Sequence, residues 1–546
     1  MEDVVEQKTV GISYSAFKKQ QAQNTQIFDA IVIGSGTGGL SVASLLAQEG
    51  KRVLLLEQHY IIGGYTHAFK RKGYIWDVGL HYVGQVHKKG TLLNKAFRYI
   101  SNDMLKWEAL DDVYDRAVFG ETEYEFPCGR ENLKTKLKEY FPHEKDSTSI
   151  DAYFALLDEV NNVGVAYYIE KVIPPFLSKI MGSFLRRKVL KFSDQTTLDV
   201  LHSITDNEKL IGVLTAQYGD YGLQPKDSSF YMHAVLANHY MEGAAYPVGG
   251  GPRLAETIVP VIEQAGGCVV SQASVQRIIV ENNRAIGVEM TNGECLYAHT
   301  IISDAGIVNT FSKLLDEDVI QQHKLDSMLE KLSPSSAHMG LYVGIRESTK
   351  QLNLPKCNYW IFPDEYDHVK NQEQYTDINA PLPVAFASFP SAKDPESELH
   401  YHGRTTAEVI ILLPDSWFSK WDATSWKKRG EEYETLKEDI AQKMLEQLYR
   451  VAPQLKGKVD YYEVSSPLST KHFSAHPYGE IYGSAHTPAR FRQTCLKPHT
   501  PVKHLYLTGQ DAMIASISGG VMGGVLCASA ILKKDMLWKI MRTIQS

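Results

Sequence analysis

Hydrophobic and polar positions first fall into a regular pattern at FDAIVI, which begins at Phe28 and has the composition of a short buried parallel strand. A glycine-rich turn, GSGTGG, follows at Gly34, and LSVASLLAQEG then has the amphipathic spacing of a helix that ends before Gly50. A second hydrophobic run, RVLLLE, ends at Glu57. This order predicts a strand, a turn, a helix and a second strand, the first unit of an α/β sheet.

The glycine turn has the spacing that a bound dinucleotide requires. Gly34 permits the tight turn, Gly36 leaves room for a pyrophosphate, and Gly39 lets the helix pack close to the strand. The helix N-terminus offers free N–H groups and a positive dipole end to the phosphates. We expect this turn, with Gly38, to bind the ADP half of NAD or FAD, and Glu57 to accept hydrogen bonds from the ribose. The carboxylate of Glu57 argues against NADPH.

Further short runs predict the rest of the sheet. Val275 to Val280, Ala285 to Met290 and Glu294 to Tyr297 are separated by Asn-Asn and Asn-Gly turns and predict a meander of hairpins. They lead into Thr300 to Ser303, which we expect to be the third strand of the dinucleotide sheet. Near the end of the chain, HLYLTG predicts another buried strand, with a helix beginning near Ser518.

Composition limits the classes of protein that the chain can be. At about 150 residues per domain, 546 residues predict two or three interleaved domains. Hydrophobic residues make up 43% and charged residues 22%, which excludes wholesale disorder. The net charge of −7 argues against nucleic acid as a partner. The six cysteines include no CxxC pair, so no metal site or disulfide framework is expected, and a reducing compartment fits best.

Two segments bear on where the protein resides. Residues 1–25 are polar and lack the hydrophobic region of a signal peptide, so we expect a flexible lead-in and a cytoplasmic protein. Residues 512–532 carry no charge and are long enough to span a bilayer. Their four glycines and several serines favour a helix packed against a sheet or a ligand, and a membrane span is the alternative.

A basic segment at residues 171–193 predicts peripheral membrane binding. It holds no acid and interleaves hydrophobic residues with Lys171, Lys179, Arg186, Arg187, Lys188 and Lys191. This is the composition of an interfacial amphipathic helix. The alternative is a surface helix whose hydrophobic face packs on the core.

After Glu57, the segment EQHYIIGGYTHAFKRKGYIWDVGLHYVGQV resembles the FAD-dependent family of phytoene desaturases, carotenoid isomerases and all-trans-retinol 13,14-reductases (retinol saturases). It is most similar to the retinol saturase pattern EQH..GG..H.F...G...D.G.HY.G. Two further blocks carry the resemblance, namely HYMEGAAYPVGGGPRLAETIVPVIEQAGGCVV from His239 and a closing segment that contains YGSAHTPARF and LTGQD. Residues 107–233 and 315–468 show no motif of the family.

The resemblance implies an α/β fold with a discontinuous Rossmann-type FAD-binding domain, similar to flavin amine oxidases and Rab GDP dissociation inhibitors (GDI), and an inserted α+β substrate domain. We expect the FAD-binding domain to comprise residues 26–105, 235–315 and 470–535. The substrate and membrane-docking domain would comprise residues 106–234 and 316–469.

The resemblance also implies site residues. Gln58, Gly63 and Gly64 would join the FAD site, the backbone of Val275 would hold the adenine, Asp511 would bind the ribityl or pyrophosphate region, and the helix at Ser518 would point toward the isoalloxazine O2. His81 and Glu480 are the candidate catalytic residues. The alternatives are a core histidine at His81, a solvated loop acid at Glu480, a loop turn at the glycine pair and a helix cap at Asp511.

The implied activity is reduction of a C=C bond in a hydrophobic isoprenoid polyene, by hydride from reduced FAD and a proton from an acid. The implied partners are a retinoid, carotenoid or related lipid, a membrane surface and an external electron donor. A carotenoid isomerase or desaturase is the first alternative. A non-enzymatic lipid-binding protein similar to GDI is the second, and the intact Gly34, Gly36, Gly39, Glu57 and Asp511 argue against it.

Overall fold

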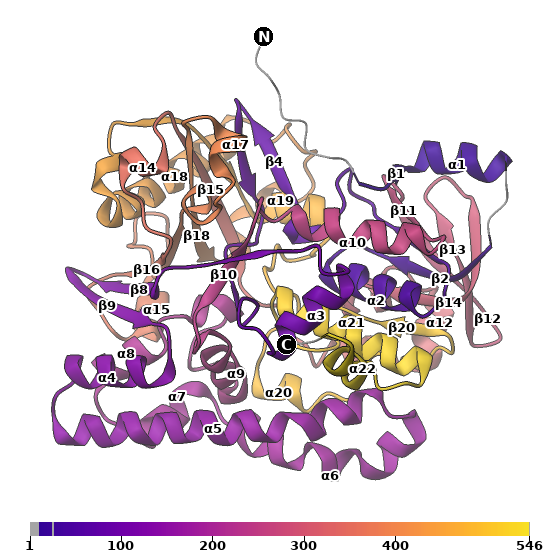
Figure 1. Ribbon diagram of the computed structural model, residues 1–546, viewed down its shortest axis with the longest axis horizontal. Helices are drawn as coiled ribbons and strands as arrows, with labels where there is room; N and C mark the ends of the chain where they lie inside the picture. The colour runs from indigo at the N-terminus through magenta and orange to yellow at the C-terminus, as the bar shows by residue number, and fades with distance from the viewer. Residues whose placement is uncertain (1–9, 24–26, 545–546) are drawn as a thin grey trace.

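The computed structural model describes residues 10–23 and 27–544. The molecule is built around two large sheets. Figure 1 shows them on opposite sides, with the helices α5 (Glu144–Val172) and α6 (Pro175–Ser193) along the lower edge. The larger sheet has the order β1-β11-β3-β2-β14-β13-β12, with β20 paired to β14. Its strands are β1 (Ile12–Ser13), β2 (Phe28–Ile33), β3 (Val53–Leu56), β11 (Cys268–Ser271), β12 (Val275–Glu281), β13 (Arg284–Met290), β14 (Cys295–Ser303) and β20 (Leu505–Leu507).

The second sheet has the order β19-β15-β18-β17-β16-β8-β9. Its strands are β8 (Val113–Phe119), β9 (Thr122–Pro127), β15 (Ala337–Ile345), β16 (Asn358–Phe362), β17 (Ala385–Ser388), β18 (Thr405–Leu413) and β19 (Val459–Ser465). These strands lie within 106–234 and 316–469, while every strand of the larger sheet except β1 lies within the ranges expected for the cofactor domain. The division into two domains stays a prediction.

Smaller elements connect the two sheets. The strands are a hairpin of β4 (Ala68–Arg71) and β5 (Tyr74–Asp77), and a small sheet of β6 (Val83–Gly84), β10 (Ala244–Pro247) and β7 (Trp107–Ala109). The longer helices are α2 (Thr37–Gln48), α3 (Leu92–Ile100), α4 (Arg130–Tyr140), α5 (Glu144–Val172), α6 (Pro175–Ser193), α9 (Phe230–Tyr240), α10 (Arg253–Gln264), α18 (Glu431–Val451), α19 (Pro467–Ser474), α21 (Ile517–Leu532) and α22 (Met536–Thr543).

The predicted first unit of the sheet is confirmed. β2 and β3 are parallel and α2 connects them, ending before Gly50, which has φ +79°. The strands β2 and β3 do not alternate between hydrophobic and polar residues, because helices cover both faces of a parallel sheet. The hairpins β12-β13 and β13-β14 form as predicted, and β14 continues in parallel register along β2.

The uncharged segment 512–532 forms the core helix α21 rather than a separate span. Its glycines let it lie directly against α2, since a Cβ at Gly524 would come within 2.6 Å of Ser41 Cβ. Two side chains of α2 donate hydrogen bonds to carbonyls of α21, Ser41 Oγ to Val521 O at 3.0 Å and Thr37 Oγ1 to Ile517 O at 3.2 Å. No single helix of the described residues has the length and hydropathy of a membrane span, although α21 and α22, bent by 115°, meet those criteria as a pair.

The flexible lead-in expected over 1–25 is wrong for residues 12–23. Ile12 and Ser13 pair in parallel with Val270 and Ser271 and so complete the edge of the larger sheet. Helix α1 (Tyr14–Gln23) follows and buries Phe17, which is 3% exposed. Ordering is favoured because the edge strand β11 gains backbone partners and an aromatic side chain leaves water. Residues 1–9 and 24–25 lie outside the described residues.

The basic segment 171–193 is divided between two helices. α5 ends at Val172, because Pro174 and Pro175 follow and start α6. The expected surface position of Lys171 is wrong, since this residue is 2% exposed and its Nζ donates to the carbonyl of Leu496. Burial lowers the pKa of Lys171 to about 7. The residues that could face a membrane therefore lie in α6 and at the end of α5.

The second sheet alternates between two environments. Met339, Leu341 and Ile411 face a separate core that α18 covers. On the other face, the strand register places Trp360 opposite Phe386 and Phe386 opposite Ile410. Strand alternation thus provides one apolar wall that points away from α18.

Candidate active site

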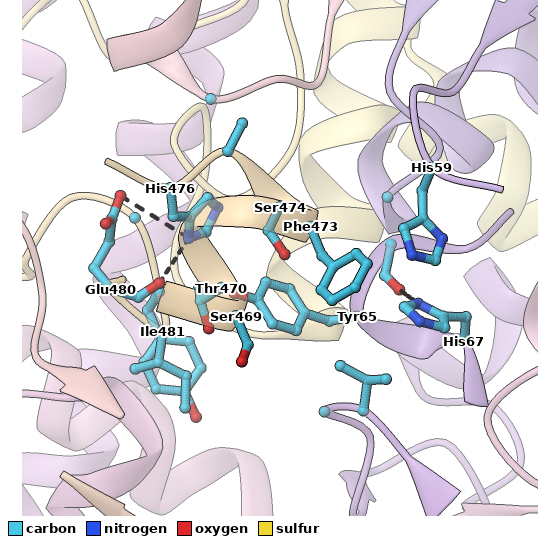
Figure 2. Close-up of a pocket in the computed structure, with 18 of the residues that line it drawn as sticks. His59, Tyr65, His67, Ser469, Thr470, Phe473, Ser474, His476, Glu480 and Ile481 are labelled. Carbon is cyan, nitrogen blue, oxygen red and sulfur yellow. Dashed lines mark hydrogen bonds and ion pairs between the residues drawn. The ribbon is translucent and has the colours of Figure 1, made fainter. Parts of the chain in front are cut away.

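One cavity of about 810 Å³ extends from the glycine turn to the apolar wall of the second sheet. This volume is in the usual range for ligand sites, roughly 300–1,000 Å³. Figure 2 shows its middle part, where His59 and His67 lie on one side, Glu480 and His476 on the other, and Tyr65 between them. The cavity therefore brings segments from the beginning, middle and end of the chain to one site.

The glycine turn at one end has no room for side chains. Gly34 has φ +98°, and a Cβ at Gly36 would come within 2.5 Å of a carboxyl oxygen of Asp304. Asp304, which follows β14, accepts a hydrogen bond from Gly39 N at 2.9 Å and so caps α2. Burial raises the pKa of Asp304 to about 8. Sequence reasoning assigned no role to this residue, although its place directly after a strand of the sheet was visible.

Glu57 and Ser35 make the turn rigid. Glu57 Oε2 accepts hydrogen bonds from Ser35 N at 2.8 Å and Ser35 Oγ at 2.6 Å, and its Oε1 accepts from His59 N at 2.8 Å. Gly63 N donates to Ser35 Oγ at 2.9 Å, which ties the glycine pair to the turn. Ser35 was missed in the sequence, and its position between two glycines of the motif is the signal that could have identified it.

The expected cofactor residues do not all reach the cavity. Those that line it are Gly34, Gly36, Gly38, Glu57, Gln58, Gly63, Gly64, Val275 and Asp511. Gly39 and Ser518 are not part of the lining: Gly39 N is taken by Asp304, and Ser518 is buried at 6% exposure. The N-cap of α21 is Ser516, whose Oγ accepts from Gly519 N at 3.0 Å, and Ser516 does line the cavity.

Asp511 has a structural role at the cavity wall, where it accepts two hydrogen bonds. Its Oδ2 accepts a hydrogen bond from Ile307 N at 2.9 Å and its Oδ1 accepts from Ser484 Oγ at 2.9 Å. It therefore caps α11 (Ile307–Ser312), and not the helix that follows it in the chain. This arrangement holds the segment after β14 against the segment after β20.

A dinucleotide fits the residues at this end. The turn excludes side chains, α2 directs its N-terminal N–H groups toward the turn, and the carboxylate of Glu57 lies at the cavity surface. The described residues contain no group of three or more His, Cys, Asp or Glu side chains that could hold a metal ion.

The opposite end of the cavity is apolar. Trp360, Val384, Phe386, Ile410 and Leu412 line it from neighbouring strands or loops of the second sheet. Sequence reasoning found no motif in these segments, because the residues are far apart in the chain and only the strand register brings them together.

His81 lies between the two ends and is neutral. Its side chain is 11% exposed, it lines the cavity, and burial lowers its pKa to about 3. Its Nδ1 is 3.0 Å from Glu408 Oε2, but the angle is poor for a hydrogen bond, so neither side chain has a partner of good geometry among the described residues. Burial raises the pKa of Glu408. Lys393 Nζ donates to the carbonyl of His81 at 2.9 Å and fixes the loop.

Glu480 is buried, so the alternative of a solvated loop acid is wrong. It is 4% exposed and lines the cavity. Its Oε2 accepts from Tyr478 N at 2.9 Å, and its Oε1 lies 3.9 Å from His476 Nδ1. Burial raises its pKa. The dashed lines in Figure 2 mark its contacts with His476, which lies toward the same side of the cavity.

Known proteins are similar over nearly the whole chain. A model of NAD(P)-binding Rossmann-like domains matches residues 32–99. The chain is 35% identical to an all-trans-retinol 13,14-reductase of Danio rerio and 34% identical to that of Homo sapiens, each over 93% of this chain and 86% of the relative. Prolycopene isomerase 1 of an Oncidium hybrid is 26% identical over 95% of this chain and 86% of its own.

Solved structures agree on the fold. Putrescine oxidase has a TM-score of 0.61 at 13% identity, over 93% of this chain and 100% of its own. Cyclohexylamine oxidase from Brevibacterium oxydans has a TM-score of 0.60 at 15% identity, over 95% and 100%. The expected fold class, a Rossmann-type α/β domain of the amine oxidase kind with a second α+β part, is confirmed. The chain is an oxidoreductase and belongs to the all-trans-retinol 13,14-reductase family.

Proposed function

We propose that the protein uses FAD to reduce one C=C bond of a hydrophobic isoprenoid polyene, in the manner of a retinol saturase. The observation that supports this most is the single cavity, which joins a dinucleotide cradle to an apolar wall. Reduced FAD would supply a hydride equivalent. The chain supplies the cradle, the exclusion of water and the orientation of the polyene. The names of the relatives, retinol reductases and more distantly a prolycopene isomerase, agree with such a substrate.

The roles of the site residues follow from their positions. The turn at Gly36 and Gly38 would receive the pyrophosphate and Glu57 the ribose, while Gln58, Gly63, Gly64 and Val275 would enclose the adenine half. Asp511 would fix the cavity wall by joining the segments after β14 and β20 through hydrogen bonds. His81 is neutral at physiological pH and would orient the polyene or the flavin as a dipole. Glu480 stays a second candidate for contact with the reacting groups.

Purified protein tests this proposal directly. It should show a flavin spectrum, and heat should release FAD. Anaerobic mixing of photoreduced protein with all-trans-retinol should reoxidise the flavin and give a product heavier by two hydrogen atoms. Isomerised or desaturated products from a panel of retinoids and carotenoids would replace the reductase with the isomerase or desaturase alternative. A protein that carries lipid but binds no flavin would favour the GDI-like alternative.

We further propose that α5 and α6 dock on an anionic membrane. Phe176, Ile180 and Phe184 repeat every four residues along α6 and are 65%, 74% and 69% exposed. Val165 and Ile169 at the end of α5 are also exposed, at 65% and 46%. The exposed bases of α6 are Lys179, Arg187, Lys188 and Lys191. Hydrophobic area beside bases is the composition that anionic bilayers bind.

Vesicle flotation distinguishes the hydrophobic contribution to docking from the electrostatic one. Replacing Phe176, Ile180 and Phe184 by serine should abolish flotation with phosphatidylserine vesicles. Replacing Arg187 and Lys188 by glutamate should weaken it, at about 1 kcal/mol per base removed. Leu399→Ser with Met104→Ser is the control, because these side chains are equally exposed, at 64% and 62%, on other segments. Unchanged flotation of both test variants would refute the docking surface.

A further inference from the structure

A further acid, Asp220, lines the cavity, and the sequence did not identify it. Asp220 belongs to the short helix η2 (Tyr218–Tyr221), follows Gly219 in the chain and lines the cavity. Gly219 is in close contact with the Trp360 ring, so this segment is pressed against the second sheet. Asp220 is thus a carboxyl group on the cavity lining, next to a glycine that packs against the apolar wall.

The hydroxyl of Tyr82 lies between two carboxyl groups. It is 2.7 Å from Asp220 Oδ2 and 3.0 Å from Asp115 Oδ2. A phenol carries one hydrogen and can donate it to one acceptor only. Both contacts can be hydrogen bonds only if one of the two carboxyl groups carries a proton of its own.

The partners of Asp115 place that proton on Asp220. Asp115 is fully buried and accepts N–H donors from Gln217 at 2.6 Å, Asn358 at 2.9 Å and Trp360 at 3.2 Å. Three such donors favour an ionised carboxylate. Tyr82 then donates to Asp115, and Asp220 donates to Tyr82 Oη or points its O–H into the cavity.

The surroundings of Asp220 agree with this assignment. Burial, together with the charge of Asp115, raises the pKa of Asp220 to about 8. The pKa of Asp115 is raised less, to about 6, because hydrogen-bond donors oppose the effect of burial. The neighbouring titratable groups also include the phenols of Tyr240 and Tyr482. Beyond Tyr82 lies Lys393, whose Nζ is 5.8 Å from the Tyr82 ring centroid and whose pKa is lowered by burial to about 8.

We propose that Asp220 is the proton donor for saturation of the polyene, an inference that rests on the proposed reduction. Reduced flavin, when bound, would supply two electrons and a hydrogen, as hydride, to one carbon of the C=C bond. The O–H bond of Asp220 breaks, and its proton forms the new C–H bond at the other carbon. The carboxylate that remains is held by the Tyr82 hydroxyl until a proton from water restores the acid.

Single-turnover kinetics test this assignment. Reduced wild-type protein is mixed anaerobically with all-trans-retinol while flavin reoxidation is followed from pH 6 to pH 10. The wild-type rate should fall above about pH 8. Asp220→Asn should bind flavin normally, reoxidise it about a hundredfold more slowly and show no such fall, in line with the usual contribution of a general acid. Asp460→Asn is the matched control, because this carboxylate also accepts from a tyrosine hydroxyl, Tyr74 at 3.0 Å, but lies outside the cavity lining.

The protonation state has its own readout, which needs no flavin or substrate. An infrared titration of wild-type protein should show protonated carboxyl absorption that disappears near pH 8, to which the buried acids Asp220, Asp304 and Glu408 all contribute. In Asp220→Asn this band should be smaller by the contribution of one carboxyl group. If wild-type flavin is not reoxidised by any polyene, the proposed function fails, whatever the infrared result. If wild-type reoxidation occurs but Asp220→Asn matches it within about threefold, or if the band is the same in both proteins, Asp220 is not the donor.

Discussion

The two ends of the cavity are built in different ways. At the dinucleotide end, backbone groups and glycines of one short segment form the cradle. Four hydrogen bonds that involve Glu57, Ser35 and Gly63 hold the cradle in place. At the apolar end, side chains from distant strands form the wall, and buried acids lie behind it. The first end depends on the absence of side chains and the second on their identity. Substitutions should therefore separate cofactor binding from substrate binding.

The largest effect is expected at the cradle. Gly36→Val should abolish flavin binding, because the added Cβ would meet the Asp304 carboxyl at 2.5 Å and the branches would fill the space for the pyrophosphate. Absorbance of the purified protein and of the heat-released cofactor measures this. Gly50→Asn is the control, since a Cβ there meets nothing within 4 Å and Asn tolerates its positive φ. Full flavin content in Gly36→Val would refute the cradle.

A substitution at the apolar end should leave flavin binding unchanged. Ile410→Asn places an amide on the cavity wall and removes apolar contact worth about 1–2 kcal/mol, so the Kd for the polyene should rise about tenfold. Flavin content should stay at the wild-type level. Loss of flavin together with polyene binding would show that the two ends do not act separately.

The pH dependence of cofactor binding tests Asp304. Its pKa, raised to about 8 by burial, means that the folded protein holds a proton there that the unfolded chain releases near pH 4. The stabilisation from this proton is lost as the pH rises toward 8, where a carboxylate would face the pyrophosphate. FAD affinity should be several-fold weaker at pH 9 than at pH 7. In Asp304→Asn, flavin fluorescence titrations at the two pH values should agree. An equal loss in both proteins would assign the effect to another group.

The smallest effect is expected at His81, between the two ends. Because its ring is neutral and has no strong hydrogen bond, His81→Ala should slow flavin reoxidation by only about three- to tenfold, roughly 1 kcal/mol of barrier. Stopped-flow absorbance at fixed pH measures the rate. A change below threefold would leave His81 with a packing role alone.

The same contrast explains what the sequence could predict. Strand β2, the glycine turn and α2 follow each other in the chain, so local spacing identified them and Glu57 correctly. Tyr82, Asp115 and Asp220 meet only because the residue before β6, the strand β8 and the helix η2 come together in the folded protein. Lys171 was misplaced for a related reason, because its carbonyl partner at Leu496 is more than three hundred residues away in the chain.

The contact between α2 and α21 has a consequence for biosynthesis. The helix α2 that begins at the glycine turn is synthesised well before its packing partner α21, because Thr37 and Ile517 are 480 residues apart in the chain. Until α21 emerges, Ser41 and Thr37 lack their carbonyl acceptors and the hydrophobic surface beside them is open to water. Cofactor loading is therefore expected only after α21 has been synthesised, and chains cut short before Ile517 should remain colourless.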